Sequence, residues 1–159
     1  MSEAPHAHNA QDADDARHGV TPDALATLLD SVPDARILSL DCFDTLLWRD
    51  THGPRDIFHA LPGVAQQQRL WAEARARRAA LVAHDRNEVS IAEIHAALLP
   101  NADAAQRARA IAGELALERR HCFAFAPVVA LMLSARARGM RVAIVSDTYL
   151  SAEQLRTLI

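Results

Sequence analysis

The chain has 159 residues, of which 50% are hydrophobic and 23% charged, and its formal net charge at pH 7 is −3. This length suffices for one domain, or for a small core with a modest insert. The near-neutral charge, without a concentrated basic face, argues against nucleic acid as an obligate partner. The longest apolar run, residues 123–135, is interrupted by Pro127 and is shorter than the roughly 20 residues that span a bilayer.

The N-terminal segment, residues 1–20, is polar, acidic and without periodicity, which predicts a disordered tail. It lacks the basic and apolar segments of a secretory signal, so we expect a cytoplasmic protein without membrane attachment.

Cys42 and Cys122 have no metal-ligand or redox spacing and are expected to be reduced core residues. Residues 21–30 begin with Thr-Pro-Asp, the pattern of a helix start, and predict a short helix.

Two short apolar segments each end on acidic or hydroxyl side chains. Residues 36–40 stop at Asp41, and residues 140–145 stop at Ser146 and Asp147. The first predicts a strand buried on both faces, and open α/β sheets place their functional groups at the carboxyl ends of such strands. An unpaired carboxylate there is costly, which indicates a bound cation or an electrophile at Asp41. The alternative is that Asp41 only caps the following turn.

Between these segments the pattern is helical from residue 55 to about residue 125, and no strand is expected there. A capping box begins at Ser90, and Asn101 is the expected N-cap of the long helix that follows. Residues 127–138 form a further predicted helix, with proline at its first position and glycine just past its end. A second capping box, at Ser151, begins the last helix.

The strand ends contain Leu-Asp-Cys-Phe-Asp-Thr-Leu-Leu (residues 40–47) and Val-Ala-Ile-Val-Ser-Asp-Thr-Tyr-Leu (residues 142–150). In this order, with a helical insert between them, they resemble the first and second motifs of the haloacid dehalogenase-like (HAD) hydrolase superfamily. The first is most similar to the subgroup with Asp-Val-Phe-Asp-Thr-Leu-Leu. The resemblance implies an α/β fold: a three-layer Rossmann-like core, present as its first two strands, over residues 21–54 and 126–159, and an all-helical cap over residues 55–125. It implies hydrolysis or transfer at a small phosphorylated metabolite.

The resemblance also assigns roles to residues at the two strand ends. Asp41 takes the position of the nucleophile, which attacks the phosphorus and forms an aspartyl intermediate. Mg²⁺ is then expected to be bound by Asp41 and the carbonyl of Phe43. Ser146 takes the position of the hydroxyl that binds an oxygen of the transferred group. Thr45 and Asp147 are the other substrate-binding candidates.

Asp44 departs from the family pattern. Most phosphatases of the family have a second Asp two residues after the nucleophile, where this chain has Phe43, and Asp44 takes the usual Gly position one residue further. A turn can bring Asp44 to the site as a general acid or base, or Asp44 can simply cap the turn, and both alternatives stay open. Dehalogenase and phosphonatase members also lack the second Asp, so the reaction type stays open too.

The third and fourth motifs of the family, a basic residue and an acidic pair, lie downstream of the second motif. All 17 basic residues of this chain are Arg, and Arg156 alone follows Ser146, too close to the strand for that role. The chain ends in an apolar helical segment, which we interpret as a cut rather than a finished domain. The resemblance therefore implies half of an active site, with an exposed sheet edge through which the chain binds a protein partner or itself. The alternative to a hydrolase is a non-catalytic module, or the N-terminal part of a larger protein, that binds a partner.

Overall fold

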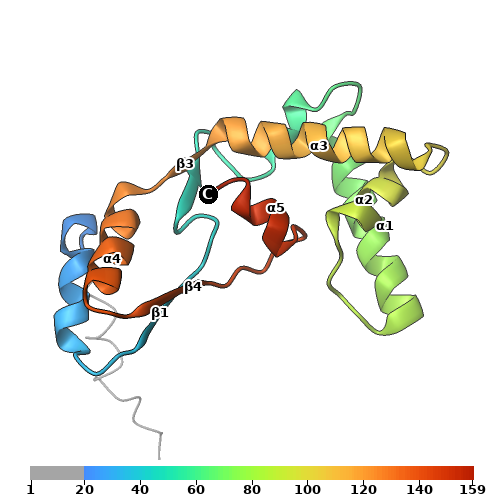
Figure 1. Ribbon diagram of the computed structural model, residues 1–159. Helices are drawn as coiled ribbons and strands as arrows, with labels where there is room; N and C mark the ends of the chain where they lie inside the picture. The colour runs from blue at the N-terminus through green and yellow to red at the C-terminus, as the bar shows by residue number, and fades with distance from the viewer. Residues whose placement is uncertain (1–19) are drawn as a thin grey trace, which may run out of the picture. The chain divides into compact units, whose positions relative to one another are not determined.

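The computed structural model describes residues 20–159, a mixed α/β protein with two separate two-stranded sheets (Figure 1). The predicted α/β class is confirmed at this level, and the predicted tail, residues 1–20, lies outside the described residues except for the exposed Val20. No helix in residues 20–159 is long and apolar enough to cross a membrane.

The elements in chain order are η2 (Pro22–Ser31), β1 (Ile37–Leu40), β2 (Leu47–Arg49), η3 (Asp56–Ala60), α1 (Gln66–His84), α2 (Ile91–Leu98), α3 (Ala104–His121), β3 (Cys122–Ala124), α4 (Ala126–Ala137), β4 (Arg141–Ile144) and α5 (Ala152–Arg156).

Contacts between residues divide the chain into two compact units. The first extends up to Leu38 and includes Ala126–Arg141, and the second contains Ser39–Phe125 and Val142–Ile159. These boundaries differ from the predicted core and cap boundaries, which stay a prediction. Both strand ends and all the helices between β2 and β3 belong to the second unit.

In the first unit, η2 packs against α4 (Figure 1). Pro22 begins η2, so the predicted helix start is confirmed, although the helix is of the 3-10 type and the Thr21 side chain makes no capping hydrogen bond. Leu29 is buried. At the surface, an Arg138 guanidinium nitrogen donates to the Asp30 carboxylate at 2.6 Å, which joins the two helices by charge as well as by packing.

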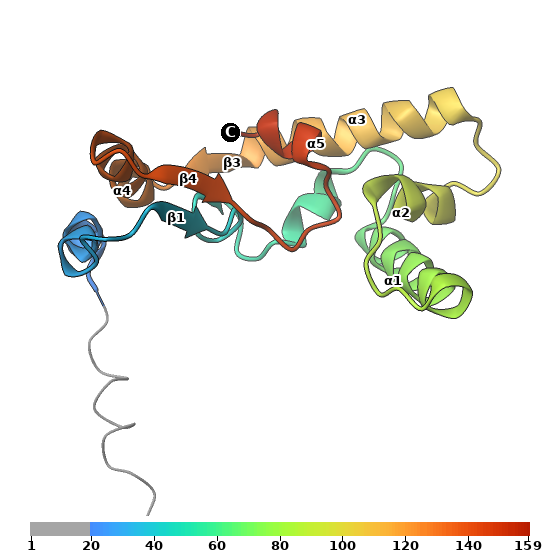
Figure 2. The same ribbon diagram turned by 60° about the horizontal axis from the view of Figure 1, so that its bottom comes forward.

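β1 and β4 lie side by side as a parallel pair (Figure 2). The Arg141 amide donates to the Arg36 carbonyl, and the Val145 amide donates to the Leu40 carbonyl, each at 2.9 Å. Both hydrogen bonds advance in the same direction along the two strands, which is the pattern of parallel pairing. Two segments a hundred residues apart thus end at the same edge of one sheet.

The prediction that β1 is buried on both faces is wrong. Ile37 is 49% exposed and Ser39 is exposed, whereas Leu38 and Leu40 are partly buried. Within the described chain β4 is the one strand that pairs with β1. Alternation of exposed and partly buried residues is expected when only one face of a sheet is covered.

A tight turn follows β1 and leads into β2. The Cys42 carbonyl accepts from the amides of Leu46 and Leu47, at 2.9 and 2.8 Å, and the Asp44 amide donates to the Leu47 carbonyl at 2.8 Å. Asp44 has a φ of 57°, the left-handed conformation that Asp and Asn adopt more readily than most residues. The chain is therefore reversed directly after the strand, at the position that glycine usually takes in the resembled motif.

β2 and β3 form an antiparallel ribbon, in which Trp48 lies opposite Phe123. The Trp48 ring stacks on Phe125 with ring centroids 4.4 Å apart. The prediction that residues 55–125 contain no strand is wrong, because Cys122–Ala124 pairs with β2. The helical segment between β2 and β3 therefore begins and ends at the same two-stranded ribbon.

The two predicted capping boxes are confirmed, and α4 begins one residue earlier than predicted, at Ala126, so that Pro127 is its second residue and not its first. The Ser90 hydroxyl accepts from the Glu93 amide at 3.3 Å, and the Glu93 carboxylate accepts from the Ser90 amide at 2.8 Å, so both capping-box bonds are made. Ser151 caps α5 in the same way. For α3 the predicted N-cap, Asn101, is wrong: Asp103 accepts from a first-turn amide at 2.7 Å. A carboxylate is also favoured there by the helix dipole.

A buried ionic cluster, Arg69, His95 and Glu114, joins α1, α2 and α3. Arg69 is fully buried, and its guanidinium donates two hydrogen bonds to the Glu114 carboxylate, at 2.9 and 2.7 Å. Nε2 of His95 lies 2.9 Å from the same carboxylate. The rings of Phe58 and Tyr149 lie against the guanidinium, with centroids 4.6 and 5.0 Å from its central carbon. Burial alone would raise the pKa of Glu114, but hydrogen bonds from His95 and Arg69 outweigh it and lower that pKa.

The helices around this cluster pack through small side chains. Ala72, Ala76 and Ala80, spaced one turn apart on α1, are buried with Val89 and Ile94 in one apolar cluster. Alanine lets two helix backbones approach closely, and α1 and α2 pack against each other along this face.

A second buried ion pair lies one turn further along α3. The Glu118 carboxylate accepts from two guanidinium nitrogens of Arg49 on β2, at 3.0 and 3.2 Å. The same guanidinium lies over the Phe43 ring, 4.3 Å from its centroid. Burial and the neighbouring Glu118 raise the pKa of Cys122 to about 12. Cys42 and Cys122 are both free, as predicted.

Removal of the Glu114 carboxylate should destabilise the protein strongly. In Glu114→Ala the buried Arg69 guanidinium loses its main anionic partner, which costs about 3–5 kcal/mol in the free energy of unfolding. The matched control is Glu88→Ala, because Glu88 pairs with Arg77 at the exposed surface, where such pairs contribute about 1 kcal/mol or less. Urea denaturation followed by circular dichroism measures both variants.

The pH dependence of stability is a second readout of the same pair. The pKa of Glu114 is lowered in the folded state, so its stabilisation is present above the ordinary value of 4.5 and is lost as the pH falls through the folded-state value. Below pH 4.5 the wild type should therefore lose stability more steeply than Glu114→Ala. This role of the buried cluster would be contradicted if the free energy of unfolding fell equally steeply with pH in the wild type and in Glu114→Ala. It would also be contradicted if Glu114→Ala were as stable as Glu88→Ala.

Candidate functional site

The register of β1 and β4 brings two predicted site residues to the same sheet edge. The last hydrogen bond of the pair joins Val145 to Leu40 at 2.9 Å, and Asp41 and Ser146 are the next residues of the two strands. Asp41 is exposed, and its Oδ1 accepts from the Cys42 amide at 2.7 Å. That bond is the local cap that the alternative role of Asp41 requires, and it leaves the other carboxylate oxygen for a ligand. Both roles therefore stay open.

A cavity of about 240 Å³ lies where the turn after β1 and the segment after β4 meet the helices. Phe43 and Asp44 line it from the turn, and Asp147 and Thr148 line it from the segment after β4. The structure thus brings Asp44 and Asp147 together. Three other predicted site residues do not line the cavity: Asp41, Thr45 and Ser146. Pockets for drug-sized molecules occupy about 300–1,000 Å³, so this cavity has the size of a small polar group.

Three arginines line the same cavity, and two of them are already paired with carboxylates. Arg49 donates to Glu118 at 3.0 Å, and Arg77 lies 3.2 Å from the Glu73 carboxylate. The Arg55 guanidinium makes no hydrogen bond or ion pair with any residue from 20 to 159. In the part of the chain that the structure describes, Arg55 is therefore the one arginine of this cavity that has no carboxylate partner, although the carboxylates of Asp44, Glu73 and Asp147 line the same cavity.

Tyr149 links the cavity to the buried cluster. It lines the cavity, and its ring lies 5.0 Å from the central carbon of the Arg69 guanidinium. Its carbonyl accepts from the Ile91 amide at 2.9 Å, which ties the segment after β4 to the start of α2. Burial raises the pKa of the Tyr149 phenol well above its ordinary value of 10, so this side chain stays protonated at neutral pH.

The described residues do not form a complete binding site for Mg²⁺. Within residues 20–159, no three His, Cys, Asp or Glu side chains come together as a metal site requires. The carboxylate of Asp41 and the carbonyl of Phe43 are suitable oxygen ligands, but Mg²⁺ demands a near-octahedral set of oxygens. The predicted cofactor therefore stays a prediction.

Sequence reasoning did not place the arginines of this cavity beside the strand ends, and it missed the buried cluster. Arg55 lies in a loop, and Arg77 lies in the middle of α1, so no local pattern connects either to the strand ends. The signal for the cluster was Arg69 itself. It shares a helical face with small apolar residues, Ala72 and Ala76, and a charge on such a face needs a buried partner.

No protein-family model matches this chain, and a search of curated proteins found no match either. The resemblance to HAD hydrolases therefore stays a prediction that rests on the two motifs.

Substitutions at Asp44 should separate its backbone role from the role of its carboxylate. Because φ at Asp44 is 57°, Asp44→Gly should keep wild-type stability, whereas the β-branched Asp44→Val should lose about 1–2 kcal/mol through strain in the turn. Thermal denaturation followed by circular dichroism measures the two variants. If Asp44→Gly is destabilised as much as Asp44→Val, the carboxylate itself holds the turn, and the backbone explanation is wrong.

Proposed function

We propose that this chain contributes the nucleophile end of a HAD-like phosphohydrolase that acts on a small phosphorylated metabolite. The proposal takes β1 and β4 as the first two strands of a three-layer core, and the helices between β2 and β3 as its cap. The observation that supports it best is the parallel register, in which Asp41 and Ser146 directly follow the hydrogen-bonded pair Leu40 and Val145. Open α/β sheets bind their ligands at this edge.

In the proposed reaction the carboxylate of Asp41 attacks the phosphorus of the substrate. A bond forms between the carboxylate oxygen and phosphorus, and the bond from phosphorus to the leaving oxygen breaks, with Asp44 as the candidate acid that protonates that oxygen. Water then attacks the aspartyl phosphate, which releases inorganic phosphate and restores the carboxylate. Ser146 donates a hydrogen bond to an oxygen of the transferred group, and Thr45 and Asp147 orient the remainder of the substrate.

The approach of a phosphoryl group to a carboxylate brings two negative charges together. At 4 Å and an effective dielectric constant of 20, the repulsion is about 4 kcal/mol, which corresponds to nearly a thousandfold in rate. A cation near the site offsets this repulsion, and the chain contains no Lys. Asp41 does not line the cavity that Arg55 lines with Asp44 and Asp147, so we assign to Arg55 the binding of the substrate's anionic group in that cavity. Mg²⁺, when bound, supplies further positive charge to the transferred group.

Asp41→Asn should abolish the hydrolase activity. An amide is a much poorer nucleophile than a carboxylate, so the release of inorganic phosphate from a panel of sugar phosphates and nucleotides should fall by about a thousandfold or more. The protein is expressed from its complete reading frame. The matched control is Asp34→Asn, which removes an exposed carboxylate before β1 and should leave the rate unchanged. Turnover that survives Asp41→Asn removes Asp41 as the nucleophile.

Arg55→Gln should weaken substrate binding without removing the nucleophile. A hydrogen bond to a charged group contributes about 1.5–3 kcal/mol, so KM should rise by about tenfold to a hundredfold, with a smaller change in kcat. The control is Arg136→Gln, at an exposed position on α4. Isothermal titration with inorganic phosphate gives a readout that needs no turnover. An unchanged KM and unchanged phosphate affinity would contradict the assignment of Arg55.

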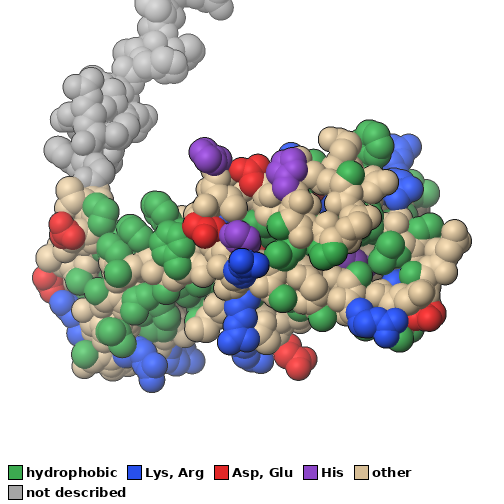
Figure 3. Space-filling model, turned by 90° about the horizontal axis from the view of Figure 1, so that it is seen from above, with side chains coloured by type: hydrophobic (Ala, Val, Ile, Leu, Met, Phe, Trp, Pro, Cys, Tyr) green, Lys and Arg blue, Asp and Glu red, His purple; other side chains and the backbone are tan. Residues whose placement is uncertain are grey.

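A second candidate is a non-catalytic module that associates with a partner or with itself. It is favoured by exposed apolar side chains of the first unit, which gather on its surface over η2 and α4 (Figure 3). They include Leu28, Val32, Ile37 and Leu133. A wild-type protein that releases no phosphate from the whole panel, and that self-associates in light scattering, would favour this candidate over the hydrolase.

A further inference from the structure

Helix α1 exposes three of its four large apolar side chains, and only Leu70 packs against an apolar cluster. Trp71 is 61% exposed, Leu81 47% and Val82 75%, while the buried face of the helix consists of alanines and Arg69. A solvated helix normally buries residues such as Trp and Val and exposes its charges. The reversal indicates that a second face of α1 is suited to contact with another molecule.

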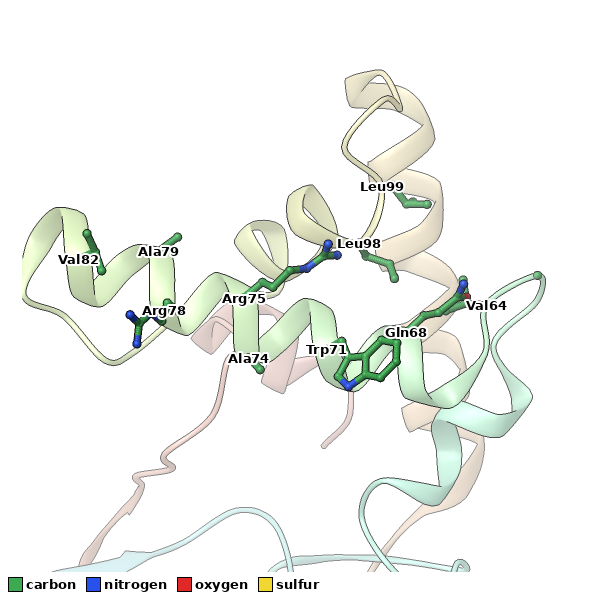
Figure 4. Close-up of a pocket in the computed structure, with 11 residues that line it drawn as sticks. Val64, Gln68, Trp71, Ala74, Arg75, Arg78, Ala79, Val82, Leu98 and Leu99 are labelled. Atoms are coloured by element: carbon green, nitrogen blue, oxygen red, sulfur yellow. The ribbon is translucent and has the colours of Figure 1, made fainter.

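This face is one wall of an open groove of about 1060 Å³ (Figure 4). Residues on the groove side of α1 recur at alternating spacings of three and four, which is the spacing of a helix-packing seam: Gln68, Trp71, Arg75, Arg78 and Val82. At 1.5 Å per residue this seam is about 21 Å long, or about four helical turns. Leu98 and Leu99, at the end of α2, form the opposite wall.

The groove combines apolar surface with positive charge. No Asp or Glu is among its lining residues, although the whole chain has a net charge of −3. Arg75 donates to the Ala97 carbonyl at 2.7 Å, and the Arg78 guanidinium makes no hydrogen bond or ion pair within residues 20–159. An occupant that is apolar on one side and acidic at its edge is complementary to this surface.

We propose that the groove binds an amphipathic, acidic helix of a partner protein. Its apolar face would cover Trp71 and Val82, and its flanking carboxylates would pair with Arg75 and Arg78. Trp and Arg are the residue types that most often dominate binding energy at interfaces. The proposal does not depend on the hydrolase activity, because none of the groove residues lines the cavity beside the strand ends.

Two other occupants fit the groove less well. A second copy of α1, in either direction, would place arginines against arginines along the seam, which like-charge repulsion disfavours. A small apolar molecule would be largely exposed, because such ligands are normally buried over about 70–90% of their surface, whereas Trp71 and Val82 border an open groove. A helix of about four turns matches both the length and the charge.

The test uses the fluorescence of Trp71 in the full chain. Trp48→Phe leaves Trp71 as the one tryptophan, because the chain has two. The probe is a designed helical peptide of about 18 residues, with leucines at the seam positions and glutamates beside them. It should shift the Trp71 emission to shorter wavelength in a saturable way, and added salt should weaken the binding. The control peptide has the same leucines and lysines in place of the glutamates.

A charge reversal makes the expectation specific. Arg78→Glu should lower the affinity for the glutamate peptide by at least about tenfold and raise the affinity for the lysine peptide, with an unchanged circular dichroism spectrum. The proposal is overturned if the glutamate peptide does not bind, or if both peptides bind equally to both proteins. It is also overturned if the protein self-associates in sedimentation experiments and Trp71→Ala abolishes that association, because the occupant is then a second copy.

Discussion

Two glutamates of α3, Glu114 and Glu118, hold the second unit together because each one binds an arginine from a distant part of the chain. Glu114 accepts two hydrogen bonds from Arg69 of α1, and Glu118 accepts two from Arg49 of β2. The removal of four charges from water is costly, and only bidentate geometry offsets that cost. The two carboxylates lie one turn apart on the same helix face, so β2 and α1 have defined positions along α3.

The arrangement of the candidate site follows from this constraint. Arg49 belongs to β2, which directly follows the turn at Asp44, so the ion pair with Glu118 also positions that turn beside the helices. The ring of Tyr149 packs on the Arg69 guanidinium, which positions the segment after β4 in the same unit. Arg49 is committed to a structural carboxylate, whereas Arg55 lines the same cavity without a carboxylate partner within residues 20–159.

The same constraint gives α1 two unlike faces. Its inner face must bring the Arg69 side chain close to α3 and still pack on α2, and alanines at Ala72, Ala76 and Ala80 leave room for both. Large apolar side chains, which a helix normally places in the core, then lie on the outer face, as Trp71 and Val82 do. The buried ionic cluster and the exposed apolar groove are therefore two consequences of one helix sequence.

The sequence by itself determined the features that depend on neighbours in the chain. The capping boxes at Ser90 and Ser151, the strand that stops at Asp41 and the turn at Asp44 all follow from residues within a few positions of each other. These features include part of the candidate site, since Asp44 and Asp147 do line one cavity.

The tertiary structure alone decided the rest. Residues 122–124 have no strand pattern of their own and become β3 because they pair with β2, and Arg69 meets Glu114 across 45 positions. Arg55 likewise reaches the cavity through the path of the chain and not through any motif. The physical reason is that a long-range strand pairing or a buried charge is stable only when a partner offsets its cost in free energy. That partner lies far away in the chain, so the local sequence does not show it.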